Sequence, residues 1–471
     1  MIDIKLNFAT IRELSCKIET GELSPISLVE DSINKIKKYN PTFNAFITIL
    51  EKTALKEAET TEKRVKKGYY KGPLDGIPYS LKDIIYIKGV RCTAGSKILK
   101  HFFPKRNAEC VSQLRRAGSI ILGTTNLNEF ASGITGINPH YGSSINPWNK
   151  DHISGGSSGG SCVSVSCGMV PFSLGTDTGG SIRVPSAYCG VVGIKPTYDL
   201  ISRDGIINLA PSLDNIGCIT RSAWDAALVL KNLIQKDRLF HYPKISNSGE
   251  DIFEEIGHKH RKLVVGIPPD YFFDDADLEI VRSFYQFVNV IESSGNHIKM
   301  VSIKGVNKIE PAWTAIRLAE ASEQHLRWIR TKASEYSEEV RTMIKNGLRI
   351  FAVDYIHSCR FKNEIRNNFL KSLKIADILV LPTTTVTAPK YSSFVRDNKE
   401  SSKIRSALLR NNIPFNITGL PAVSIPVGFD RFRIPIGVQI VGKPYQEGTI
   451  LSIAFAFEQK YNSLAKFIPP I

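Results

Sequence analysis

A forty-residue segment, Ser154 to Gly193, constrains this chain more than any other part of it. The segment contains ten glycines and a dense set of serines and threonines, whereas the average glycine content of proteins is about 7%. A flexible linker would share this composition, but it would not carry the apolar runs at residues 163–170 and 191–194. We therefore predict a loop, a buried helix of small residues, a second loop and a strand, in that order.

The sequence on either side of this segment alternates short β-rich runs with helical stretches, which is typical of an α/β protein. Strands are predicted at residues 84–87, 119–122, 263–267, 377–382, 422–427 and 437–441. Helices are predicted at residues 110–117 and 450–458, over most of 276–365, and within 8–66 with a break at Ser24-Pro25. Residues 236–262 are polar and are predicted to form a surface excursion. The predicted fold is a sheet largely covered by helices on both faces.

The 471 residues are predicted to form one domain, 1–471, although length alone would suggest about three. The sequence shows no internal repeat. Its parts are an N-terminal helical segment (1–71), a core segment (72–230), a variable helical segment (276–365) and a second core segment (375–460).

The net charge and the cysteine content limit which partners and which metal sites the protein can be expected to have. The net charge of +16 is spread thinly, without a basic stripe interleaved with aromatic residues, so a solvated surface is expected and an anionic partner is left open. The eight cysteines form no CxxC pair and no zinc-ligand spacing, which indicates reduced structural thiols and no metal site. No cofactor is expected. The start of the chain lacks the apolar run of a signal peptide, and no run of about 18 apolar residues occurs. We expect a cytoplasmic protein without a membrane partner.

Two glycine-rich loops carry the chemistry, Ser154–Ser161 and Gly175–Arg183. Glycine lets successive backbone N–H groups face an anion, so a serine at the end of such a run can have its own oxyanion hole. Acyl transfer needs this arrangement. The alternative is a phosphate loop, but the chain lacks the GxxxxGK[ST] pattern and has no GxGxxG after a strand in these loops.

A lysine is a better candidate for the base than a histidine. Residues 155–159 match G-x-S-x-G, but that motif needs a histidine near the C-terminus, and the last one here is His357. Ser32 and Lys35 match S-x-x-K by chance, within an amphipathic helix. Lys82 instead follows an apolar, strand-like approach, where burial would lower its pKa from about 10.4.

Four segments, 72–83, 155–161, 175–183 and 190–197, together resemble the amidase signature family. Further matches at residues 126–130, 138–148, 212–214 and 414–422 extend the resemblance over nearly the whole chain, most weakly at 235–375. The resemblance implies an α/β amidase signature fold, in which helices cover both faces of a large mixed central sheet.

The resemblance also implies a catalytic triad of Lys82, Ser157 and Ser181. Lys82 would be the base, Ser157 the bridging hydroxyl on a cis peptide bond, and Ser181 the nucleophile. The backbone N–H groups of the nucleophile and of three residues before it would form the oxyanion hole: Thr178, Gly179 and Gly180. Three further residues are expected to support the loops rather than react: Ser158, Asp177 and Arg183.

Three functions are compatible with these residues. The first is a stand-alone amidase that converts a small-molecule carboxamide into acid and ammonia, with a homodimer left open. The alternative resembles the glutaminase subunit of the aspartyl/glutamyl-tRNA amidotransferase, which releases ammonia from glutamine for a partner subunit; the positive charge suits tRNA. That branch usually has an acid just ahead of the segment matching residues 413–416, and residues 409–412 contain none. The third function is a non-catalytic amide-binding protein.

The substrate pocket is predicted only in outline. Segments 313–360 and 383–415 should form part of its walls. Within and around them, four apolar or aromatic residues are candidate contacts, each equally suited to core packing: Ile134, Tyr141, Trp313 and Phe415. Separately, Asp199 occupies a position where the family usually has glycine, and aspartate tolerates a left-handed backbone better than most residues.

Overall fold

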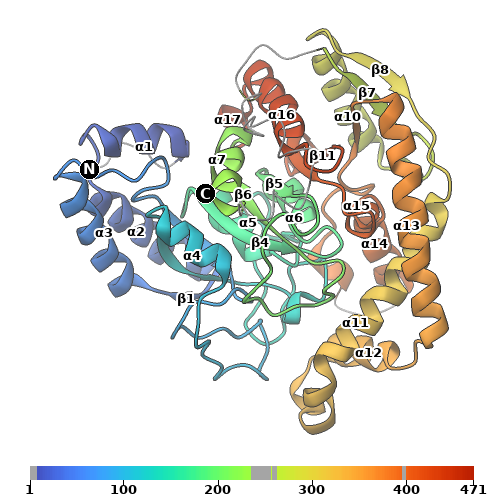
Figure 1. Ribbon diagram of the computed structural model, residues 1–471, viewed down its shortest axis with the longest axis horizontal. Coiled ribbons are helices and arrows are strands. Elements are labelled where there is room, and N and C mark those ends of the chain that lie inside the picture. Colours follow the sequence, from blue (N-terminus) through green and yellow to red (C-terminus); the bar gives the residue numbers. More distant parts are fainter. Residues whose placement is uncertain (1–7, 235–255, 257–261, 395–398) are drawn as a thin grey trace.

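One mixed sheet runs through the computed structural model, which describes residues 8–234, 256, 262–394 and 399–471 (Figure 1). Its 11 strands lie in the order β1-β3-β2-β4-β6-β5-β10-β11-β9-β7-β8. The strands are β1 (Phe46–Ile49), β2 (Pro78–Lys82), β3 (Ile120–Thr125), β4 (Phe172–Asp177), β5 (Val192–Lys195), β6 (Asn215–Thr220), β7 (Val264–Ile267), β8 (His297–Met300), β9 (Ile378–Pro382), β10 (Ala422–Phe429) and β11 (Pro435–Val441). The predicted α/β fold with a large mixed sheet is confirmed.

The sheet has parallel pairs towards both ends and an antiparallel centre. Strands β3, β2 and β4 are parallel neighbours, and so are β9, β7 and β8. Between them, β4, β6, β5, β10, β11 and β9 pair antiparallel. The strands from β2 to β9 in this order are almost entirely buried, because helices cover both faces.

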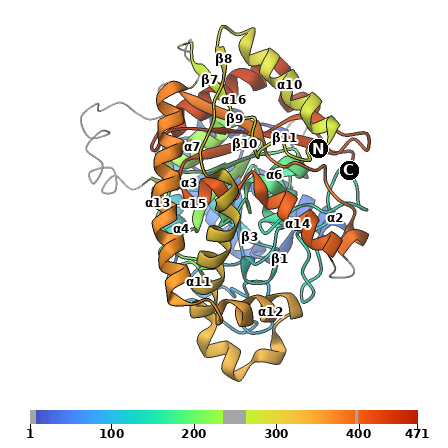
Figure 2. The same cartoon turned by 90° about the vertical axis from the view of Figure 1, so that its right-hand side faces the viewer.

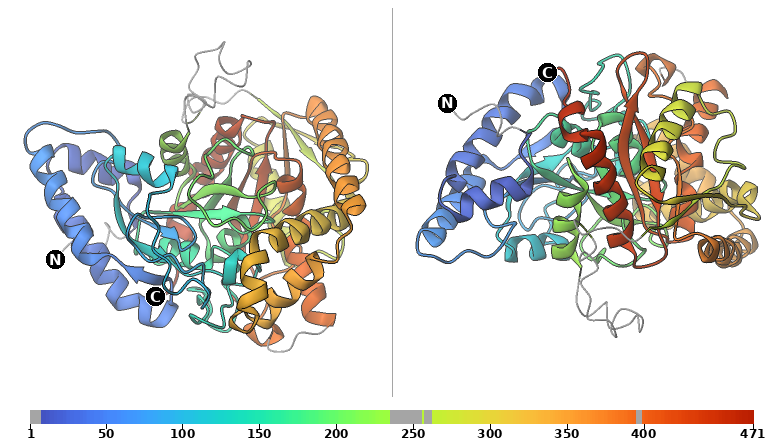
Figure 3. Two further views of the ribbon diagram at one scale, coloured as in Figure 1. Left: turned by 60° about the horizontal axis from the view of Figure 1, so that its bottom comes forward. Right: turned by 90° about the horizontal axis from the view of Figure 1, so that it is seen from above.

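The helices form distinct layers around this sheet (Figure 3). Helices α7, α10 and α16 pack together along one face, while α5 and α6 pack against the other. Helices α1 to α3 lie at one side of the molecule, and the long α11 and α13 run side by side at the opposite side (Figures 1 and 2). Their bounds are α1 (Ile11–Glu19), α2 (Pro25–Phe43), α3 (Glu51–Val65), α4 (Glu109–Arg116), α5 (Gly159–Ser166), α6 (Arg183–Cys189), α7 (Ala223–Leu233), α10 (Leu278–Glu292), α11 (Ile309–Thr331), α12 (Glu338–Gly347), α13 (Ala352–Ile375), α14 (Lys399–Arg410), α15 (Ile413–Ile417), α16 (Glu447–Tyr461) and α17 (Ser463–Lys466).

Most of the predicted elements are present, and local signals explain why. The predicted break at Ser24-Pro25 separates α1 from α2, because the Ser24 hydroxyl accepts from the N–H groups of Ile26 and Ser27 and Pro25 occupies the first helical turn. The buried helix of small residues is α5, and the strand after it in the prediction is β5. Asp199 has φ 67°, the left-handed conformation considered for it.

Other predictions were wrong or incomplete. Residues 84–87 do not form a strand; β2 ends at Lys82, whose carbonyl accepts from the N–H groups of Ile84 and Ile85 in a turn. The glycine-rich segment also contains β4 and α6, which the sequence analysis did not separate. Strands β1 and β8 were predicted as helical sequence. The predicted excursion at 236–262 lies outside the described residues, except for 256 and 262.

Two further observations concern the part of the chain with described coordinates. None of its helices combines the length and apolar character that a membrane-crossing helix needs, and it contains no cluster of three or more His, Cys, Asp or Glu residues arranged to hold a metal. Six of the eight cysteines are buried as free thiols. The sheet draws strands from residues 46–220 and from 264–441, while the division of the domain into four parts stays a prediction.

Candidate active site

Lys82 is the last residue of β2, which lies between β3 and β4 in the interior of the sheet. Its Nζ donates to Ser157 Oγ at 2.7 Å and to Thr176 Oγ1 at 2.9 Å. All three side chains are buried, and Lys82 has no solvent exposure. The structure therefore brings together the first two residues of the predicted triad.

Burial lowers the pKa of Lys82 from 10.5 to about 7, although nearby Asp177 and Asp214 oppose this shift. Desolvation disfavours the charged ammonium, and the two carboxylates favour it. At neutral pH roughly half of the Lys82 side chains are therefore uncharged. An amine in this state can accept a proton, which a surface lysine cannot do at this pH.

The loop that carries Ser157 is fixed by close backbone contacts. The peptide bond between Gly156 and Ser157 is cis, as the resemblance predicts. A Cβ at Gly156 would lie 2.2 Å from Asn128 Oδ1 and 2.6 Å from the Gly136 nitrogen, so only glycine fits there. The loop thus packs directly against residues 128–136 and presents its serine to Lys82.

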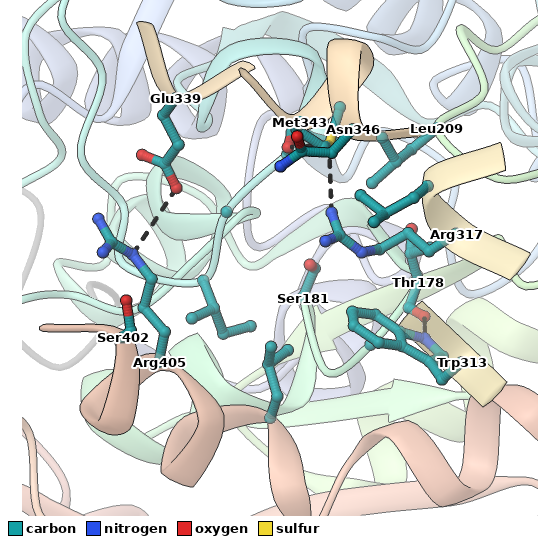
Figure 4. A pocket seen from close by; sticks show the side chains of 17 residues that line it. Thr178, Ser181, Leu209, Trp313, Arg317, Glu339, Met343, Asn346, Ser402 and Arg405 are labelled. Atoms are coloured by element: carbon teal, nitrogen blue, oxygen red, sulfur yellow. Dashed lines mark hydrogen bonds and ion pairs between the residues drawn. The ribbon is translucent and has the colours of Figure 1, made fainter. Parts of the chain in front are cut away.

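Ser181 lies between β4 and α6, and it lines a pocket (Figure 4). Its carbonyl accepts from the Ser158 N–H at 3.0 Å, which ties the two glycine-rich loops together. Its Oγ forms no hydrogen bond with any residue that the structure describes, so the link from Ser157 to Ser181 is open here. Catalytic hydrogen bonds are often long before substrate binds and tighten in the complex.

The oxyanion-hole prediction needs one correction. The Gly180 N–H donates to Asp177 Oδ1 at 2.8 Å, so it is already satisfied within the loop. In contrast, the N–H groups of Thr178, Gly179 and Ser181 have no acceptor within the described residues. Three N–H groups rather than four are free to face a developing oxyanion. Gly180 instead provides the turn, with φ 113°.

A fully buried ion pair holds this loop. Arg183 donates from Nε to Asp177 Oδ2 at 3.0 Å and from Nη2 to Asp177 Oδ1 at 2.9 Å, a bidentate arrangement. Burial alone would raise the pKa of Asp177, but the Arg183 charge outweighs it and holds the pKa well below its usual range. Asp177 also accepts from the N–H of Ile182. The pair lies where the sequence analysis expected a supporting role.

Ser158 also supports the loops. Its hydroxyl donates to the Thr176 carbonyl at 3.1 Å, and its N–H bonds to Ser181 as described above. These bonds connect the first glycine-rich loop to β4.

Four residues that support the site were not predicted in this role: Asp214, Trp313, Asn416 and Thr176. Thr178 Oγ1 donates to Asp214 Oδ1 at 2.6 Å, and Trp313 Nε1 donates to the Thr178 carbonyl at 3.0 Å. Asn416 Nδ2 donates to the Asp177 carbonyl at 2.9 Å. Asp214 and Asn416 lie in segments that matched the family, and that match was the available signal.

The fourth is Thr176, which shares Lys82 Nζ with Ser157. Its only signal was its place in the second glycine-rich loop, Gly175–Arg183. Thr176 contacts Lys82 because β2 pairs with β4, and the sequence alone does not reveal this pairing.

Ser181 opens into a pocket of about 370 Å³. Its walls come from five places: the loop at 131–134, the oxyanion loop, Leu209, α11 with α12, and α14. The contributions of α11, α12 and α14 were predicted for segments 313–360 and 383–415. Ile134 and Trp313 line this pocket, but the other two candidates do not. Phe415 packs against Phe272 and Phe369 in the core, and Tyr141 lies beside Asn44, to which its carbonyl is hydrogen-bonded.

Three charged side chains line the same pocket (Figure 4). Glu339 Oε1 lies 3.7 Å from Arg405 Nε, so these two residues form an ion pair. The third, Arg317, reaches into the pocket from α11 and donates to Met343 Sδ at 3.2 Å.

The chain is similar to known proteins over most of its length. The family model named Amidase matches residues 27–451. The A subunit of the glutamyl-tRNA(Gln) amidotransferase from Carboxydothermus hydrogenoformans is 33% identical, covering 97% of this chain and 98% of that protein. The same protein from Legionella pneumophila (strain Corby) is 34% identical, covering 96% and 97%.

Solved structures are similar over the same length. The crystal structure of an amidase superposes with a TM-score of 0.85 at 30% identity, covering 96% of this chain and 100% of that one. A peptide amidase from Stenotrophomonas maltophilia has a TM-score of 0.83 at 26% identity, covering 96% and 97%.

Proposed function

This chain belongs to the amidase family, and on that premise we propose that it hydrolyses a carboxamide through an acyl-enzyme on Ser181. It is an enzyme that acts on amide C–N bonds. The observation that carries the proposed mechanism is the contact of 2.7 Å between Lys82 Nζ and Ser157 Oγ, both completely buried beside the Ser181 loop.

The chemistry follows from the order of these groups. Neutral Lys82 takes the proton of Ser157, which takes the proton of Ser181 as its oxygen attacks the amide carbon. The N–H groups of Thr178, Gly179 and Ser181 stabilise the resulting oxyanion, each contributing about 3–4 kcal/mol in comparable sites. The proton returns by the same route to the departing nitrogen, and ammonia leaves. Water then attacks the acyl carbon, giving the acid and free Ser181.

Of the two specific functions, the comparisons favour the amidotransferase subunit over the stand-alone amidase that the sequence analysis placed first. Both curated relatives described above carry that name and match end to end. In this reading the amide is glutamine, and the ammonia passes to a partner subunit, which uses it on glutamyl-tRNA(Gln). The net charge of +16 suits an anionic tRNA.

One observation keeps the stand-alone amidase as a second candidate. Where the amidotransferase branch has an acid, this chain has Asn411 and Asn412, and both side chains donate to backbone carbonyls in the interior. Neither residue is among those that line the pocket. An ammonium group on the substrate therefore has no carboxylate at this position.

The test has two stages. A fluorophosphonate should label wild-type chain at Ser181, identified by peptide mass spectrometry, and should leave Ser181→Ala unlabelled. Ammonia release from glutamine and from simple amides is then measured on the purified chain and on chain isolated with its co-purifying partners. Glutamine turnover that depends on partners supports the amidotransferase reading, and turnover by the chain alone supports the amidase. Labelling elsewhere than Ser181 would refute the mechanism.

A further inference from the structure

The side chain of Arg317 lies in the pocket, where a substrate can contact it. It lies on α11 four residues after Trp313, so the two side chains share one face of the helix. The guanidinium carbon lies 4.9 Å from the centre of the Trp313 ring, whose indole N–H holds the oxyanion loop through the Thr178 carbonyl. Arg317 and Ser181 line the same pocket, and Figure 4 shows the guanidinium reaching into it.

The hydrogen-bonding capacity of this guanidinium is mostly unused. Its Nη1 donates to Met343 Sδ at 3.2 Å, and a thioether is only a weak acceptor. Its Nε is buried and has no hydrogen-bond partner. The other pocket arginine, Arg405, already has Glu339 as its carboxylate partner. Within the described part of the chain, Arg317 has no such ion pair.

Arg317 is half-buried, and a cation that is partly withdrawn from water without a counter-ion among the described residues is costly, so its presence needs a reason. Burial lowers the pKa of Arg317 to about 10, and Glu339 opposes this shift, so the side chain still carries its charge at neutral pH. Ile134, Leu209 and Leu318 give the pocket an apolar part, and Ser132 and Asn346 add polar side chains to its lining. Since Glu339 is paired with Arg405, Arg317 is the charged group of this lining that is placed to attract an anion entering the pocket.

We propose that Arg317 binds a carboxylate of the substrate, and that the enzyme therefore prefers amides that also carry a carboxylate group. This inference rests on the proposed amide hydrolysis and applies to both specific functions considered above. The planar guanidinium presents paired N–H donors that match a carboxylate. The substrate class is thus the half-amides of dicarboxylic acids and the amino acids with a side-chain amide.

The main test compares two amides that differ only in charge. Ammonia release is measured from glutaramate and succinamate and from their neutral methyl esters, with wild type and with Arg317→Met. Initial rates of ammonia release are compared, because hydrolysis of the ester would itself produce the carboxylate substrate. Wild type should prefer the carboxylates by about 10- to 100-fold in kcat/KM, and Arg317→Met should lose that preference, measured in each variant as the ratio of kcat/KM for carboxylate and ester.

Two further variants separate specific contact from general charge. Arg317→Lys keeps the positive charge but lacks the paired N–H donors of the guanidinium, so it should retain part of the preference for carboxylates. Arg327→Met removes a positive charge from the exposed face of the same helix and should retain all of it. Equal reaction of carboxylates and esters in wild type, or an undiminished preference in folded Arg317→Met, would overturn the inference.

A protection assay provides a readout that does not require the right substrate. Glutarate should slow fluorophosphonate labelling of Ser181 in wild type and in Arg327→Met, but not in Arg317→Met. If Ser181 is labelled and glutarate gives no protection in wild type, the carboxylate inference fails and the proposed mechanism stands. If Ser181 is not labelled and no amide releases ammonia, the proposed function itself fails.

Discussion

Lys82 Nζ and Ser157 Oγ lie 2.7 Å apart, and neither residue is exposed to solvent. Water therefore cannot carry the proton between them, and the transfer depends on the charge state of a single amine. Asp177 and Asp214 act on that amine from a distance through their charges. The pH dependence of the enzyme should report on this arrangement directly.

We expect the rate of Ser181 labelling to rise with pH and to level off above about 7. Burial sets the pKa of Lys82 at about 7, and only the neutral amine accepts a proton. Below that value the rate should fall about tenfold for each pH unit, as the neutral fraction does. The measurement is the second-order rate constant for a fluorophosphonate, whose own ionisation does not change over this range. A rate that is flat between about pH 5 and about pH 8 would contradict this role for Lys82.

Replacing Asp214 should move this profile. Its carboxylate raises the pKa of Lys82, so Asp214→Asn should lower that pKa and shift the acid limb of the rate profile to lower pH. The asparagine oxygen can still accept from Thr178 Oγ1, which helps to keep the loop in place. Thr178→Val provides the control, because it removes the same hydrogen bond and leaves the charge. A shift of equal size in both variants would mean that loop geometry, not charge, is responsible.

The proton relay should behave as one unit in a double-mutant cycle. Lys82→Met and Ser157→Ala each interrupt the same path, so each should slow labelling of Ser181 by about 10²- to 10⁴-fold. The double variant should be no slower than the worse single variant, because the path is already broken. Circular dichroism and thermal melting check that both variants fold. Additive losses would show that the two residues act independently.

The buried ion pair of Asp177 and Arg183 should contribute strongly to the free energy of unfolding. Asp177→Asn leaves the Arg183 charge buried without a counter-ion, which should lower the free energy of unfolding by about 3–5 kcal/mol. The exposed pair of Arg106 and Asp204 offers a matched control, because Asp204→Asn should cost less than about 1 kcal/mol. Urea unfolding measures both. Similar values for the two variants would argue against a special role for the buried pair.

Gly180 should be intolerant of a side chain. It has φ 113°, and a Cβ there would lie 2.6 Å from the Cβ of Asn412. Gly180→Ala should therefore displace the neighbouring N–H donors and reduce kcat by about 10²- to 10³-fold, comparable to the loss of one oxyanion donor. Gly68 also has a positive φ, 82°, but nothing within 4 Å of its would-be Cβ. Gly68→Ala should leave kcat unchanged, so an equal loss in both variants would point to general strain.

The resemblance to the amidase signature family implied the triad, which stays a prediction. The local sequence agrees with it, because Ser157 and Ser181 lie in glycine-rich loops and Lys82 ends an apolar strand. Thr176 and Asn416 were not predictable in the same way, since their partners lie 94 and 239 positions away in the sequence. The Gly180 N–H shows the same limit, because the sequence does not reveal that Asp177 occupies it.

Strand predictions failed where pairing with a neighbouring strand, rather than local composition, determines whether a segment forms a strand. The run at residues 84–87 has a strong β composition but follows a turn at Lys82 and forms only one isolated bridge, between Ile85 and Ile206. Conversely, β1 and β8 are four-residue strands at the two edges of the sheet, and one neighbour each holds them in place. Short edge strands of this kind carry little sequence pattern of their own.

The proposed reacting groups and the helical wall of the pocket come from separate parts of the chain. Lys82, Ser157 and Ser181 belong to strands and loops before residue 190, whereas α11, α12 and α14 form most of the opposite wall. Substitutions in these helices can therefore alter which amide is accepted and leave the proton relay intact. Trp313 is the exception, because it belongs to the wall and also holds the oxyanion loop through the Thr178 carbonyl. A chimaera that takes α11 and α12 from a relative and retains this tryptophan should acquire the donor's selectivity and keep its own turnover chemistry.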